Sequence, residues 1–107
     1  MSLDVCLTNA DGTGAYSANI THNLNKMAAA AGIYECLWRP EEHGITHARQ
    51  IIEPLEKGLT RMVLNKTEFE AYNAPNGWGK WSDFIWWCAD YLQACRDNPD
   101  ALVNVSR

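Results

Sequence analysis

A long apolar stripe between residues 48 and 63 constrains the fold of this 107-residue chain more than any other feature. Apolar side chains recur there three or four positions apart, with charged side chains between them, as in a helix that buries one face. Pro54 interrupts the segment, but the period continues through it without a change of phase. The pattern therefore predicts one kinked helix, whose core stripe is Ala48, Ile51, Ile52, Leu55, Leu59, Met62 and Val63.

A second helical stripe lies near the end of the chain. Ser82 has the side chain of an N-cap, and Pro99 follows the last periodic residue. The expected core positions are Phe84, Cys88, Tyr91, Leu92 and Cys95. The sequence therefore predicts a final helix that runs from Ser82 to about Asp97.

Two shorter helices are predicted from weaker patterns. Residues 19–31 place apolar side chains at helical spacing and end before Gly32, a typical C-terminal cap. Residues 67–72 begin with Thr67 and Glu70, which have the spacing of a capping box. Residues 33–43 are broken by a proline and predict an irregular connection or a single turn.

The two ends of the chain have strand character. Residues 3–7 and 101–106 alternate apolar and polar side chains. We expect these strands to pair with each other, because an isolated strand leaves its backbone groups unsatisfied. The predicted fold is a mainly α, single domain over residues 1–107: a compact bundle of three to four helices with a minor two-stranded sheet from the chain ends.

The charge distribution limits the classes of partner that the protein is expected to bind. Thirteen acids against nine bases give a net charge of -4, and the basic residues form no stripe. This argues against nucleic acid and an anionic membrane surface as partners. The sequence begins without a signal-peptide pattern and contains no run of about 20 apolar residues. We therefore expect a cytoplasmic protein whose partner is itself or another protein.

The four cysteines do not predict a disulfide or metal framework. Cys88 and Cys95 are seven positions apart in one predicted helix, hence roughly 10 Å apart, too far to bridge. No CxxC pair occurs, and we expect all four thiols to be reduced. The acid and histidine cluster at 41–47 is divided by Gly44, so its two rings do not share one helical face. No metal and no cofactor are expected.

A polar group in the predicted first helix is a candidate ligand site. Asn19, His22 and Lys26 share the face opposite the apolar stripe, with Asn23 beside them. His22 there can bind an anion or move a proton. Alternatively, it is merely solvated. In either case we expect His22→Ala to leave stability nearly unchanged.

The loop at residues 76–81 holds two tryptophans among glycines. Trp78 and Trp81 are candidate ligand-binding residues, since such a loop can offer a rigid aromatic face. It can equally be a lid that folds both rings onto the core. A binding cleft would require His22 and Asn23 to face this loop.

Trp86 is the candidate interface residue. On a wheel of the final helix it points roughly 200° from Phe84, among Asp83, Asp90 and Asp97. A large ring amid acids on the outward face calls for a covering element. That cover is either the chain's own segment at residues 33–38 or its terminal strands, or else a second subunit or a partner. Symmetric dimers are the commonest oligomers, so we expect a homodimer with Trp86 at or near the interface.

Several stretches resemble a group of small uncharacterised proteins from phages and bacteria. They are residues 18–24, Leu37-Trp38-Arg39-Pro40-Glu41-Glu42, Asn76-Gly77-Trp78-Gly79 and the ending from Asn98 to Arg107. The likeness covers roughly residues 16–107. It implies a bacterial or prophage setting and brings no activity, cofactor or catalytic residue.

The motifs of phosphate-binding loops and of the nucleophile elbow are missing from the sequence. The sequence therefore favours a non-catalytic accessory or protein-interaction domain. The alternative is a small-molecule-binding protein or minor hydrolase with a polar site around His22 and Trp78.

Overall fold

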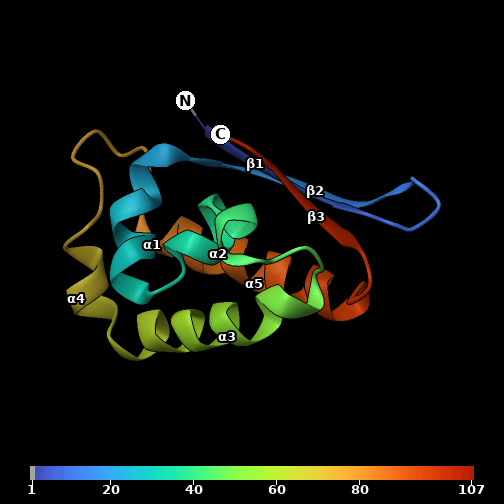
Figure 1. Cartoon of the computed structure of the whole chain (residues 1–107). Helices are drawn as coiled ribbons and strands as arrows, with labels where there is room; N and C mark the ends of the chain where they lie inside the picture. The colour runs from blue at the N-terminus through green and yellow to red at the C-terminus, as the bar shows by residue number, and fades with distance from the viewer. Residues whose placement is uncertain (1) are drawn as a thin grey trace.

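The structure of the protein is a computed structural model that describes residues 2–107 (Figure 1). Three strands form one sheet, and the helices pack on one of its faces. The strands are β1 (Ser2–Thr8), β2 (Gly14–Thr21) and β3 (Leu102–Ser106). The helices are α1 (Asn25–Ala31), α2 (Tyr34–Trp38), α3 (Arg49–Leu64), α4 (Lys66–Glu70) and α5 (Trp81–Asp97), with 3-10 turns at His22–Leu24 and Pro40–His43.

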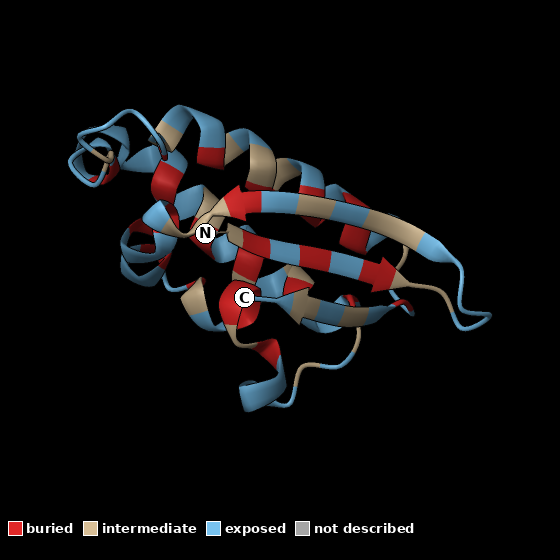
Figure 2. Cartoon of the chain, turned by 90° about the horizontal axis from the view of Figure 1, so that it is seen from above, coloured by how far each residue is buried: buried red, intermediate tan, exposed pale blue. Residues whose placement is uncertain are grey.

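The sheet is antiparallel with strand order β2-β1-β3. β1 is central, and its inward side chains Leu3, Val5 and Leu7 are completely buried. The alternation of buried and exposed positions is visible along the strands in Figure 2. Val5 lies opposite Val105, so the predicted pairing of the two terminal strands is confirmed.

The prediction of a mainly α bundle with a two-stranded sheet is wrong, because the protein is α+β with three strands. The missed strand is β2. Asn19 lies in β2, and α1 begins only at Asn25. Ile20 and Leu24 happen to fall at helical spacing, but Thr21 ends the strand, and its Oγ1 accepts a hydrogen bond from the backbone N–H of Asn23 at 3.2 Å.

The two long helices were predicted correctly, except that Val63, expected in the core stripe of α3, is 50% exposed. α3 is one helix that contains Pro54, and it packs against α5. The α5 stripe is buried as expected: Phe84, Cys88, Tyr91, Leu92 and Cys95. The predicted C-terminal cap at Gly32 is confirmed, but neither predicted N-terminal cap is present, because Asn65 and Lys80 precede α4 and α5 without a side-chain cap bond. Residue identity alone does not make a cap unless the side chain reaches a free N–H.

The connection at residues 33–43 fills the space between the sheet and the long helices. It is more regular than the expected irregular connection or single turn, since it forms α2 and a 3-10 turn. Leu37 and Trp38 are both buried. Gly58 of α3 lets this segment approach closely, because a Cβ at that position would lie 2.1 Å from Cγ2 of Ile33. None of the helices within residues 2–107 has the length and apolar character that crossing a membrane requires.

Candidate functional site

A groove lies between the start of α1 and the loop that follows α4. Its volume is about 940 Å³, and it is lined by residues 22, 23, 25 and 26 on one side and 71–76 on the other. Asn23 ties the two sides together, because its Nδ2 donates to the carbonyl oxygen of Trp78 at 2.9 Å. The structure therefore places His22 and Asn23 beside the tryptophan loop, the arrangement that a cleft at these residues requires.

His22 has a structural partner that the sequence did not reveal. Nε1 of the buried Trp38 donates to Nδ1 of His22 at 2.8 Å. An indole N–H can only donate, so Nδ1 is an acceptor and the proton of the neutral ring sits on Nε2. The expectation of a free, solvated histidine is therefore wrong. Nδ1 of His22 accepts a hydrogen bond from a core residue, and Nε2–H is the donor that remains for a ligand in the groove.

The other predicted ligand residues separate in space. Asn19 is on the outer face of the sheet, where its Nδ2 donates to Ser2 and to Asp4. Trp81 is half-buried and donates Nε1 to the carbonyl of Met62 at 3.0 Å. Trp78, in contrast, is 71% exposed. Of the two tryptophans, Trp81 belongs to the core and Trp78 remains accessible.

Two asparagines of the groove escaped the sequence analysis, which treated residues 73–77 only as a turn. Asn73 Oδ1 accepts from the backbone N–H of Trp81 at 2.7 Å, and Asn76 Oδ1 accepts from that of Trp78 at 3.0 Å. These bonds shape the loop and leave both amide NH₂ groups as donors. The closely spaced asparagines were the signal, since such side chains commonly bond nearby backbone N–H groups.

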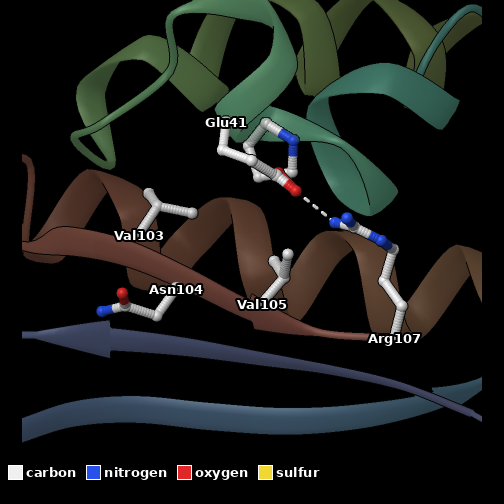
Figure 3. Close-up of a pocket in the computed structure, with 6 residues that line it drawn as sticks. Glu41, Val103, Asn104, Val105 and Arg107 are labelled. Atoms are coloured by element: carbon white, nitrogen blue, oxygen red, sulfur yellow. Dashed lines mark hydrogen bonds and ion pairs between the residues drawn. The ribbon is translucent and has the colours of Figure 1, made fainter.

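The two acids of the 41–47 cluster form ion pairs elsewhere. Glu41 pairs with Arg107 across a second hollow of about 330 Å³, shown in Figure 3. Glu42 pairs with Arg39. Within residues 2–107, no three acid, cysteine or histidine side chains gather in a way that could hold a metal ion.

Trp86 lies on the solvent face of α5, and its side chain is 71% exposed. This helix runs against the edge strand β2: Trp87 donates Nε1 to the carbonyl of Asn19 at 3.1 Å, and Tyr91 stacks on Tyr16 at 5.9 Å between ring centroids. Burial raises the pKa of Tyr16, and the charge of nearby Asp90 raises it further. We call the outer edge of β2 together with the exposed face of α5 the β2–α5 surface.

Three of the four thiols and one tyrosine lie in the core beneath the sheet. All four cysteines are free; Cys6 is exposed and the other three are buried. Burial raises the pKa of Cys36 and Cys95 to about 12, so these thiols are poor nucleophiles. The hydroxyl of Tyr91 is buried without a hydrogen-bond partner within residues 2–107, and burial raises its pKa.

Comparison with known proteins adds no family. The chain matches no protein-family model, no curated protein and no solved structure. The resemblance to small phage and bacterial proteins stays a prediction, and function must be argued from the two surfaces described above.

Proposed function

We propose that this protein is a protein-interaction domain that binds an extended segment of a partner along the β2–α5 surface. The observation that carries the proposal is a sheet edge that pairs with no further strand within residues 2–107 and that borders α5, the helix that carries the exposed Trp86. An open edge offers unpaired backbone donors and acceptors to an added strand. Four free thiols support a reducing, cytoplasmic setting for this interaction.

The register of the sheet indicates which groups point outwards. Val103 donates its N–H to the carbonyl of Thr46 at 2.9 Å, so its backbone groups face away from β1. The N–H and C=O groups of successive residues point alternately to the two sides of a strand. Following this alternation from Val103 through the pairing with β1 to β2, the N–H and C=O of Ser17 and Asn19 face the outer edge of β2. The bond from Trp87 to the Asn19 carbonyl agrees with this orientation.

The two edges of the sheet differ. β3 is covered at its outer side by the segment around Thr46 and His47, with a bridge between His47 and Leu102. No further strand or bridge lies outside β2 within residues 2–107, although Trp87 of α5 occupies the carbonyl of Asn19 there. The sequence of β2, Gly-Ala-Tyr-Ser-Ala-Asn-Ile-Thr, contains no charged residue and no proline, the usual protections of an exposed edge.

The charges beside this edge favour a basic partner. Asp83, Asp90 and Asp97 share the exposed face of α5 with Trp86, and none of them forms an ion pair with another residue of the described chain. A lysine- or arginine-rich strand would neutralise these acids and could stack a cation on Trp86. A second copy would instead bring its own acids against them, so we favour a basic segment over self-association.

A peptide titration tests this proposal. We expect an eight-residue peptide of alternating threonine and lysine to bind, and a threonine-glutamate peptide not to bind. Ser17→Pro should abolish binding, because it removes an outward N–H while leaving the pairing with β1 intact. Trp86→Ala should weaken binding about tenfold. The matched control Leu64→Ala removes a side chain that is 77% exposed elsewhere and should have no effect.

Light scattering tests whether a second copy of the chain, and not a partner segment, occupies the β2–α5 surface. We expect the wild-type mass to equal the chain mass of 12.0 kDa. Twice that mass, reduced to the chain mass by Trp86→Glu or Ser17→Pro, would assign the surface to a second copy. Failure to bind the basic peptide by a monomeric wild type would reject the proposal.

A further inference from the structure

We infer that the groove between α1 and the loop after α4 binds a small organic carboxylate, with the charged end near Lys26 and an apolar body against Tyr72. This site is separate from the β2–α5 surface and does not depend on the function proposed there. The inference rests on which atoms of the groove are already used within the protein and which remain free.

The acceptor atoms of three groove residues are already occupied. His22 Nδ1 accepts from Trp38, Asn73 Oδ1 from the N–H of Trp81, and Asn76 Oδ1 from that of Trp78. Each of these donors can only donate, which fixes the orientation of the three side chains. What remains at each residue is a donor, either Nε2–H or an amide NH₂. Two groove residues do not follow this rule: Asn23 uses a donor on the carbonyl of Trp78, and the side chain of Asn25 forms no hydrogen bond within residues 2–107.

The charge of the groove also favours an anionic ligand. The chain carries a net charge of -4, yet none of the ten residues that line the groove is an acid. Lys26 is exposed, and its ammonium has no carboxylate within ion-pair distance among residues 2–107. A donor-rich, cationic groove in an acidic protein selects an anion, because charge-assisted hydrogen bonds are stronger than neutral ones.

The loop side supplies the apolar wall. Ala71, Tyr72, Ala74 and Pro75 line it, and Tyr72 is 42% exposed, so much of its ring is available for contact. Pockets for small molecules combine such apolar walls with a few placed polar groups. A carboxylate attached to an aromatic or aliphatic body fits this arrangement better than a bare inorganic anion.

Nuclear magnetic resonance titration tests the inference with three probes. We expect benzoate to shift the amide resonances of residues 22–26 and 71–76 with a dissociation constant of about 1 mM. Benzamide, the neutral isostere, should bind about tenfold more weakly, and so should inorganic phosphate. Lys26→Gln should weaken benzoate binding about fivefold, whereas Lys57→Gln, a lysine on α3 outside the groove, should not change it.

Three results would overturn the inference. The first is benzoate binding no tighter than benzamide, which would remove the role of charge. The second is phosphate binding as tightly as benzoate, which would remove the role of the apolar body. The third is a titration in which benzoate shifts no groove resonance, or in which Lys26→Gln and Lys57→Gln behave alike. The dispersion of the amide resonances in the same spectra checks independently that each sample is folded.

Discussion

Replacing His22 with alanine tests whether the contact between His22 and Trp38 stabilises the fold. Trp38 is 2% exposed, and its indole N–H donates to His22 Nδ1 at 2.8 Å. The ring cannot turn away easily, because it stacks on Tyr34 with centroids 5.6 Å apart. Loss of the imidazole therefore leaves a donor without its partner at the edge of the core.

The expected cost follows from that geometry. An unsatisfied buried donor costs about 1 to 3 kcal/mol. In a protein of this size, a loss of that amount lowers the melting temperature by roughly 5 to 15 °C. This replaces the expectation from sequence alone, that a solvated His22 contributes nothing. His22→Asn should recover part of the loss, because Oδ1 of asparagine can accept in place of Nδ1.

The assay is urea and thermal unfolding of the wild type, His22→Ala, Trp38→Phe and the double variant. Because Trp38→Phe removes the N–H, we expect His22→Ala to cost less than about 0.5 kcal/mol in that background. His43→Ala, at an exposed histidine, is the matched control and should leave the free energy of unfolding unchanged. Equal losses from His22→Ala in both backgrounds, or no loss at all, would refute the reasoning.

Three further outcomes are expected. Gly58→Ala should destabilise the protein by about 1 to 3 kcal/mol, because its Cβ would clash with Ile33. Gly14→Ala places its Cβ in open space and should not destabilise the protein, and urea unfolding curves of the two variants test the difference. Tyr91→Phe should stabilise by about 1 kcal/mol by removing an unpaired buried hydroxyl; a lower midpoint in urea would show a hidden partner. Ellman's reagent at about pH 8 should label only Cys6 in the native state, and rapid labelling of a further thiol would contradict the burial of Cys36, Cys88 and Cys95.

The long helices could be predicted because their information is local. Burial in α3 and α5 recurs every three or four residues, so each sequence window contains the evidence for its own helix. β2 lacks such a signal. Its inward positions Ala18 and Tyr16 are only partly buried, and its stability comes from pairing with β1. A strand defined by its neighbour is hard to recognise from its own residues.

The candidate site, too, could be predicted from the sequence only in part. Sequence patterns identified His22, Asn23 and Trp78 as unusual, but not the contacts that give them roles. Asn23 and Trp78 are 55 positions apart, and His22 and Trp38 are 16 apart. Contacts of that separation depend on how the elements pack. The donor preference of the groove became evident only once those partners were known.

The five tryptophans show how packing separates structural from accessible side chains. Three of them donate their indole N–H: Trp38 to His22, Trp81 to the Met62 carbonyl, and Trp87 to the Asn19 carbonyl. Trp78 and Trp86 have no such partner within residues 2–107, and each is 71% exposed. A tryptophan that packs in a core usually satisfies its polar atom as well. The two that do neither lie beside the groove and on the β2–α5 surface, which is where we expect a bound ligand or strand to cover them.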